Sequence, residues 1–267
     1  MMRNIVRTMK RSFNRRQALA AFGSVSLGAL LAACGDDGGG GASTAVSTTD
    51  GRTTTVEPKT KAGTATSELF GDSSSCTLTM QETEGPYYFD VDSIRSDIRE
   101  DREGARLRLA IRVRDAKSCE PLKNTVVDIW HCDAAGVYSG FEAASTGAGG
   151  GPGGGGRTDQ KKYLRGAQVT NSDGIVEFVT VYPGWYRGRT VHIHGKVHVD
   201  SKTALTTQFF FDEDVSARVY ERRPYSEHQG RDVFNDSDSI FDRTLLLDLS
   251  KDGNGYLGVI SLDVQSA

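Results

Sequence analysis

Residues 106–132, RLRLAIRVRDAKSCEPLKNTVVDIWHC, decide the fold class of this chain. Apolar and charged side chains alternate over 107–115, and β-branched residues dominate 125–131; both patterns are typical of β-strands. The polar stretch between them contains Cys119 and indicates a turn. The quoted stretch therefore predicts a strand, a turn and a second strand.

The same pattern continues along the chain. Two strand-like runs lie on either side of a Ser-Asp-Gly turn within 167–181, and further runs are TTQFFFD, TLLLDLS and GYLGVISLDV. Helical periodicity is weak everywhere except a short charged stretch over 214–223. At least seven strands separated by turns predict an all-β protein, a β-sandwich of mostly antiparallel strands with long loops, in a transthyretin-like arrangement.

The composition divides the chain into three parts. The chain has 267 residues, 25% of them charged and 37% hydrophobic, which suits one globular domain plus some non-globular sequence. Residues 35–75 are almost all small or polar and predict a flexible tether. The domain is expected over 76–267, with a disordered glycine-rich surface insert at about 144–160.

The first 34 residues have the features of an export signal. A basic head precedes the uncharged stretch 18–33, which is too short to span a bilayer comfortably. The sequence NRRQAL resembles a twin-arginine signal, and 31–34, LAAC, resembles a bacterial lipobox. We therefore expect an exported lipoprotein, anchored to a membrane of the cell envelope through acylated Cys34; the leaflet stays open.

Three cysteines remain in the exported part. An oxidising compartment favours one disulfide and one unpaired thiol among Cys76, Cys119 and Cys132. Cys119 belongs to the predicted turn, and Cys132 lies further along the next strand, roughly 30 Å away if the chain is extended. This separation argues against that pair and favours Cys76 with Cys119.

The polar residues of 181–197, VYPGWYRGRTVHIHGKV, suggest a metal site. His192 and His194 flank Ile193, so in a strand both imidazoles point to one face. A solvated strand face would show the same alternation, and His198 continues it. Tyr138 and Tyr186 follow turns and could add phenolate ligands, for which ferric iron is the suitable Lewis acid.

These residues resemble a known family. The stretches VDIWHCDAAGVYSGF, YLRGAQVTNSDGIVEFVTVYPGWYRGRTVHIHGKV and LTTQFFF are similar to the intradiol ring-cleavage dioxygenases over about 76–262. The resemblance implies an Fe(III) cofactor, a catechol-type substrate and O2, with the ring opened between its two hydroxylated carbons to a cis,cis-muconate. It assigns the metal ligands to Tyr138, Tyr186, His192 and His194.

The resemblance also implies further site residues. Arg189 and Gln208 would support the reacting substrate electrostatically, and Tyr186 would take part in catalysis as well as in metal binding. Arg189 lies three residues before His192, so the chain must bend or bulge around Thr190 and Val191 for its side chain to face the ligands. Other substrate-binding candidates are Tyr87, Tyr88 and Arg165.

Several questions stay open. The net charge of −3 and the lack of a basic, aromatic-rich stripe argue against nucleic-acid binding. The alternative to an enzyme is a non-catalytic metal-binding or structural sandwich module of the cell envelope, which would have the same strand pattern. Neither the particular catechol nor a homo-oligomeric state follows from the sequence.

Overall fold

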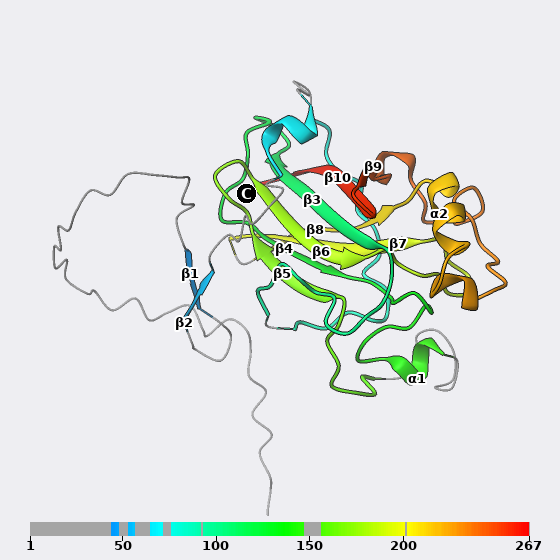
Figure 1. The fold of residues 1–267 in the computed structure, drawn as a ribbon. Helices are drawn as coiled ribbons and strands as arrows, with labels where there is room; N and C mark the ends of the chain where they lie inside the picture. Colours follow the sequence, from blue (N-terminus) through cyan, green and yellow to red (C-terminus); the bar gives the residue numbers. More distant parts are fainter. Residues whose placement is uncertain are drawn as a thin grey trace, which may run out of the picture. The chain divides into compact units, whose positions relative to one another are not determined.

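The computed structural model describes residues 44–47, 53–56, 65–71, 76–91, 93–146, 156–200 and 202–266. The predicted signal peptide, Cys34, most of the predicted tether and the middle of the glycine-rich insert lie outside these ranges. Strands dominate the described part of the chain, which confirms the prediction of an all-β fold (Figure 1).

The domain consists of two four-stranded sheets. The first sheet has the order β6-β3-β10-β9, with β3 at Arg106–Asp115, β6 at Ile175–Val181, β9 at Asp248–Asp252 and β10 at Gly255–Val264. The second sheet has the order β5-β4-β7-β8, with β4 at Val126–Trp130, β5 at Arg165–Val169, β7 at His192–Val199 and β8 at Lys202–Phe210. Within these two sheets only β3 and β10 pair in parallel, so the predicted, mostly antiparallel sandwich is confirmed.

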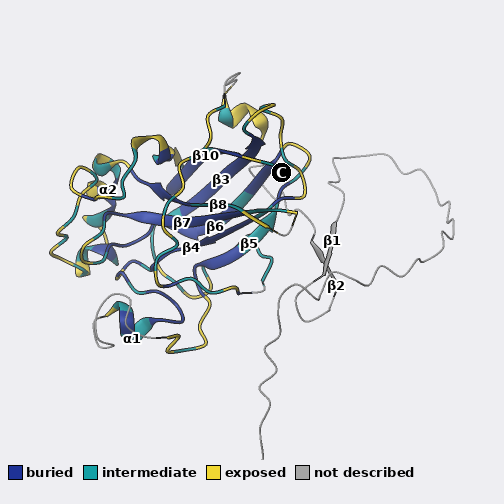
Figure 2. Cartoon of the chain, turned by 180° about the vertical axis from the view of Figure 1, so that it is seen from behind, coloured by how far each residue is buried: buried dark blue, intermediate teal, exposed yellow. Residues whose placement is uncertain are grey.

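Alternate side chains of both sheets form one hydrophobic core. Leu109 and Phe178 from the first sheet belong to the same buried cluster as Ile129, Ile193 and Phe209 from the second. Side chains alternate along a strand. The residues next to Ile129, Ile193 and Phe209 must therefore project from the opposite face of the second sheet. The strands β3, β4, β7 and β10 are largely dark blue in Figure 2, and many of the exposed residues lie in the loops.

Short helices lie in the connections. They are α1 at Glu142–Ser145, α2 at Glu213–Tyr220, and the 3-10 turns η2 at Ser67–Phe70, η3 at Tyr225–Glu227 and η4 at Arg243–Leu245. The Asp212 carboxylate caps α2 by accepting from the backbone N–H groups of Asp214 and Val215. Among the described residues, no helix is long and apolar enough to cross a membrane.

Two predicted boundaries differ from the structure. The expected strand over 244–250 begins as η4, because the Asp242 side chain accepts from the backbone N–H of Thr244, and the strand β9 starts only at Asp248. The expected tether contains two short paired strands, β1 at Thr44–Ser47 and β2 at Thr53–Val56. Its last part is packed on the domain: Ala65 donates its N–H to Glu177, and the Phe70 ring lies 4.9 Å from the Arg112 guanidinium.

A disulfide ties the start of the predicted domain to the sandwich. Of the pairings left open by the sequence, the structure contains Cys76–Cys119, with a Cα–Cα distance of 5.6 Å. Cys132 is a buried free thiol. After Cys76 the chain runs along both sheets, since the N–H of Thr79 donates to Asp263 and the N–H of Glu82 donates to Thr206. This path brings residues 83–90 to the second sheet.

Candidate metal centre

Four residues form one row across the second sheet. Trp130 on β4 is paired with Arg165 on β5 and with His194 on β7, and His194 is paired with Gln208 on β8. Residues paired across antiparallel strands project from the same face of a sheet. The row therefore lies on the face opposite the core, and it brings the predicted ligand His194 beside Gln208.

The four predicted ligands converge at this row. Nε2 of His192 lies 3.1 Å from Nε2 of His194 and 3.1 Å from the hydroxyl of Tyr186. The hydroxyl of Tyr138 lies 3.5 Å from the same nitrogen. The histidines come from β7 and the tyrosines from two separate loops, so the fold alone brings these side chains together.

The donor atoms suit a metal ion. Nδ1 of His192 lies 2.7 Å from the carbonyl oxygen of Thr190, which can only accept, so Nδ1 donates and Nε2 keeps its lone pair. Ligands about 2.1 Å from one metal lie roughly 3 to 3.5 Å from one another, which agrees with the distances above. Among the described residues there is no group of three or more His, Cys, Asp or Glu side chains that could bind a metal. A metal here would therefore need the tyrosines as ligands.

Burial controls the charge of all four side chains. Loss of solvent lowers the pKa of His192 to about 3 and lowers that of His194 well below its usual range, so both imidazoles are neutral, as metal ligands must be. Burial also raises the pKa of Tyr138 and Tyr186 above the ordinary phenol value. Only a strong Lewis acid would make these phenols anionic, and hard phenolate donors favour ferric iron.

Two glycines allow the tyrosine loops to pack against each other. Gly136 has a φ of +81°, and a Cβ there would lie 2.2 Å from the carbonyl oxygen of Trp185. At Gly184 a Cβ would lie 2.4 Å from the carbonyl oxygen of Asp133. Larger residues at either position would separate the loop of Tyr138 from that of Tyr186. The glycines in these two motifs are thus needed for the ligands to meet.

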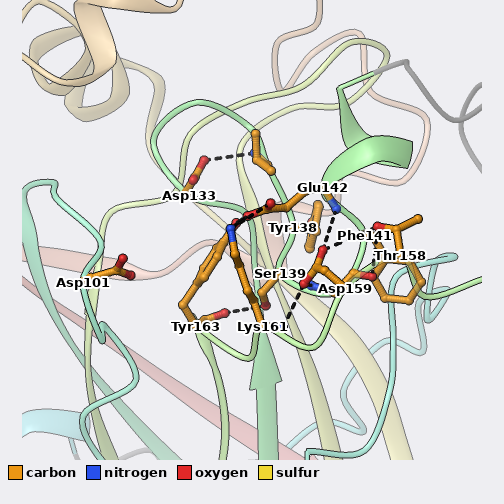
Figure 3. A network of polar contacts seen from close by, with 12 residues as sticks. Asp101, Asp133, Tyr138, Ser139, Phe141, Glu142, Thr158, Asp159, Lys161 and Tyr163 are labelled. Carbon is orange, nitrogen blue, oxygen red and sulfur yellow. Dashed lines mark hydrogen bonds and ion pairs between the residues drawn. The ribbon is translucent and has the colours of Figure 1, made fainter.

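A polar network holds the loop after Tyr138 (Figure 3). The Asp159 carboxylate accepts from the backbone N–H groups of Gly140, Glu142 and Lys161 at 2.9, 3.3 and 2.8 Å. The N–H of Thr158 donates to Gly140 at 2.7 Å. The described flanks of the glycine-rich insert therefore meet beside the Tyr138 loop, and α1 at Glu142–Ser145 includes the first residues of the predicted insert.

Arg189 and Gln208 contact each other directly. Nη2 of Arg189 donates to Oε1 of Gln208 at 2.6 Å, and Nε2 of Gln208 donates to the carbonyl oxygen of Thr83 at 3.0 Å. Arg189 precedes β7, and the chain bends at Val191. This bend takes Arg189 out of the alternation of β7, so that its guanidinium reaches the strand partner of His194.

Residues 83–90 cover one side of the row. The Tyr87 ring lies 4.8 Å from that of Tyr138, and the Tyr88 ring lies 4.7 Å from that of Trp130. The Tyr88 hydroxyl donates to Asp128 at 3.2 Å. Two of the three predicted substrate residues therefore pack on members of the site, Tyr87 as a buried side chain and Tyr88 as a partly buried one.

Arg165 has a different environment from the one its predicted role suggests. Its side chain is 1% exposed, and Nη2 donates to the carbonyl oxygen of Ser139 at 2.8 Å. Its guanidinium lies 4.4 Å from the Phe89 ring and 5.9 Å from the Tyr138 ring. The direct contacts of Arg165 thus support the Tyr138 loop, and solvent does not reach the guanidinium.

Sequence reasoning missed several residues around the site. The Trp130 ring stacks on the His194 ring at 4.8 Å with an interplanar angle of 5°. Gly85 approaches His194, and Asp238 accepts a hydrogen bond from Arg189. Trp130 is the last residue of β4, within a stretch that the sequence predicts as a strand, but its stacking on His194 depends on the pairing of β4 with β7, which no local pattern gives. Asp238 lies in the polar stretch NDSDSI, which contains no motif.

Comparison with known proteins identifies the family of this chain. Residues 83–219, just over half of the chain, match the family described as Dioxygenase. The structure is similar to the intradiol ring-cleavage dioxygenase from Tetranychus urticae, with 34% identity, a TM-score of 0.66, and coverage of 71% of this chain and 95% of that chain. The chain therefore belongs to the intradiol ring-cleavage dioxygenase family.

Two curated relatives are similar over shorter regions. The chlorocatechol 1,2-dioxygenase of Rhodococcus opacus is 29% identical over 136 residues, which are 44% of this chain and 48% of that protein. The catechol 1,2-dioxygenase 1 of Acinetobacter lwoffii is 32% identical over 114 residues, 36% of this chain and 32% of that protein. The chain thus matches half or less of the length of these relatives.

Proposed function

We propose that this chain is a ferric, non-haem dioxygenase that inserts both atoms of O2 into a catechol. The ring would open between its two hydroxylated carbons and give a cis,cis-muconate. The observation that carries the proposal is the convergence of His192, His194, Tyr138 and Tyr186, whose donor atoms have the spacing of ligands around one metal ion. The names of the curated relatives support a catechol-type substrate.

The two tyrosines would have different roles. When bound, ferric iron would accept the two catechol oxygens and make the ring electron-rich enough for O2 to attack. Tyr138 is completely buried and held by the 140–159 network, which suits a permanent ligand. Tyr186 is only partly buried and lies on a turn, so its phenolate oxygen can move and accept a proton from a substrate hydroxyl.

Arg189 and Gln208 would act on the substrate. Arg189 keeps a fixed orientation because both Nε and Nη2 have acceptors, at 2.8 and 2.6 Å. A fixed positive charge beside the ring stabilises negative charge that develops during the reaction without further reorganisation. Gln208 joins Arg189 to the carbonyl of Thr83, so residues 83–90 and the guanidinium keep a defined spacing.

The test of this function is metal content, colour and oxygen uptake by the purified chain. We expect about one iron per chain, broad visible absorption from tyrosinate-to-iron charge transfer, and O2 uptake with catechol, protocatechuate or hydroxyquinol. Replacing Tyr138 or Tyr186 by Phe should shift or remove the band, since each supplies a donor oxygen. Colourless protein with full iron occupancy would refute the tyrosinate ligands.

The competing function is a non-catalytic sandwich module. A module that only carries a metal such as zinc would be colourless, and a purely structural module would bind no metal. Either would consume no O2 with any of the three catechols, so the same measurements separate all three possibilities.

We further propose that the chain is exported and held at the cell envelope by lipid on Cys34. The sequence features of 1–34 support this location. Replacing Cys34 by Ala should move the protein from the membrane fraction to the soluble fraction while oxygen uptake stays unchanged. A variant that stays with the membrane after a high-salt wash would contradict the lipid anchor.

A further inference from the structure

Asp238 is a buried carboxylate directly behind Arg189. It lies in the loop between η3 and η4, and its side chain is 1% exposed. Oδ2 accepts from Nε of Arg189 at 2.8 Å and from the backbone N–H of Thr190 at 2.8 Å. Oδ1 accepts from the backbone N–H of Ile240 at 2.8 Å. Asp238 lies beyond residues 83–219, where the family match ends.

All three partners of Asp238 are N–H donors, so the site requires two acceptor oxygens. An ionised carboxylate provides them, whereas an asparagine amide would turn its NH2 group toward one of these donors. Although burial opposes ionisation, the N–H groups of Thr190 and Ile240 and the charge of Arg189 hold the pKa of Asp238 below its ordinary value. The carboxylate is therefore suited to fix a guanidinium.

The contacts of Asp238 explain how Arg189 reaches the site. Arg189 has left the regular alternation of β7, so the strand does not orient its side chain. Its Nε is held by Asp238 on one side, and its Nη2 is held by Gln208 on the other. With both bonds in place the guanidinium has one orientation, next to the strand partner of His194.

We propose that Asp238 is a positioning residue that orients Arg189 for catalysis. This inference rests on the proposed function, because Arg189 acts on the reacting substrate. The bonding partners of the Asp238 carboxylate are Arg189, Thr190 and Ile240, none of which is a predicted metal ligand, and its effect on kcat passes through the guanidinium. The loss of Asp238 should therefore lower kcat while the metal ligands stay in place.

The test is a double-mutant cycle with Asp238→Asn, Arg189→Ala and the double variant. Removal of one preorganised charge typically lowers kcat about a hundredfold to a thousandfold, and we expect this for Arg189→Ala. Asp238→Asn leaves a mobile guanidinium, so kcat should fall roughly tenfold or more, with a smaller change in KM. The double variant should be no slower than Arg189→Ala if Asp238 acts on the reaction through Arg189 alone, as proposed.

Asp263→Asn is the matched control. Asp263 also holds an arginine, since its carboxylate accepts from Nε and Nη2 of Arg114 at 2.7 and 3.0 Å, and both side chains are buried. This pair joins β3 and β10 of the first sheet, so the variant weakens a buried arginine–carboxylate pair away from Arg189 and Thr190. We expect its kcat to match the parent value.

Iron content and the visible spectrum are measured for every variant. Parent-like iron and spectrum, together with the kinetics above, support the inference. Three outcomes overturn it. The first is a parent-like kcat in Asp238→Asn, and the second is a double variant whose loss of kcat equals the product of the two single losses. The third is loss of iron or colour, which would show that Asp238 acts through Thr190, the bonding partner of His192. A parent chain without colour or turnover would refute the proposed function as well, whereas an active parent with any of these outcomes refutes the role of Asp238 alone.

Discussion

Gly85 lets residues 83–90 pack closely against His194, a predicted metal ligand, and replacing Gly85 by alanine tests that contact. Gly85 has a φ of +71°, and an ideal Cβ at this position would lie 3.1 Å from Cε1 of His194. Ordinary contacts of a Cβ begin near 3.4 Å, so the His194 ring or the segment would have to move by a few tenths of an ångström. The His194 ring also stacks on Trp130, which limits its movement.

Two costs must be separated in Gly85→Ala. A side chain in the left-handed region costs about 1–2 kcal/mol, regardless of its surroundings. Gly253 is the matched control because it has a φ of +59° in the turn between β9 and β10, with nothing within 4 Å of an ideal Cβ. Gly253→Ala therefore carries the backbone cost alone, and the difference between the variants reports the contact with His194.

The assay combines urea unfolding of the iron-free variants with an iron titration followed by visible absorption. Both variants should lose about 1–2 kcal/mol of unfolding free energy from the backbone. Only Gly85→Ala should also bind iron more weakly and show a shifted band, because one ligand has moved. Identical iron affinity and spectra in the two variants would refute the contact between residues 83–90 and the metal ligand.

Two further predictions concern stability. Cys119→Ser should lower the unfolding free energy by about 4 kcal/mol, because the disulfide to Cys76 spans 43 residues and limits the unfolded chain; an unchanged urea midpoint would contradict this. Burial lowers the pKa of His131 to about 4, against about 6.5 in the unfolded chain. Between these two values only the unfolded chain binds the proton, so the unfolding free energy should fall by up to about 1.4 kcal/mol per pH unit as the pH drops from 6.5 toward 4. The stability deficit of His131→Asn should therefore shrink over this range, and a constant deficit would show that His131 does not titrate as stated.

The strands were predictable because each is specified locally. Alternation over 107–115 and the H-x-H spacing of His192 and His194 depend only on the two-residue period of a strand. The end of the tether was not predictable in this way. Ala65 and Phe70 stand in a mostly polar stretch, and contacts that exist only in the folded sheet hold them. They contact Glu177 and Arg112, and they pack on a small buried cluster of the first sheet.

The site was predictable only as far as its motifs extend. The four predicted ligands, Arg189 and Gln208 stand at spacings that resemble a family, and the structure brings them together. The supporting residues come from pairings between distant segments, such as Trp130 with His194 and Asp238 with Arg189. No local pattern encodes such pairings, because strand order and loop packing bring these residues together only in the folded chain.

The alternation of β7 explains why the fold cannot by itself distinguish the enzyme from a structural module. Ile193 lies in the hydrophobic core, while its neighbours His192 and His194 project from the opposite face. The predicted ligands could be lost by substitution while the core of both sheets stayed intact, so stability places little constraint on the chemistry. Only the face covered by residues 83–90 differs between the two possibilities. The function must therefore be judged from the row of residues on that face and from the loops that complete it.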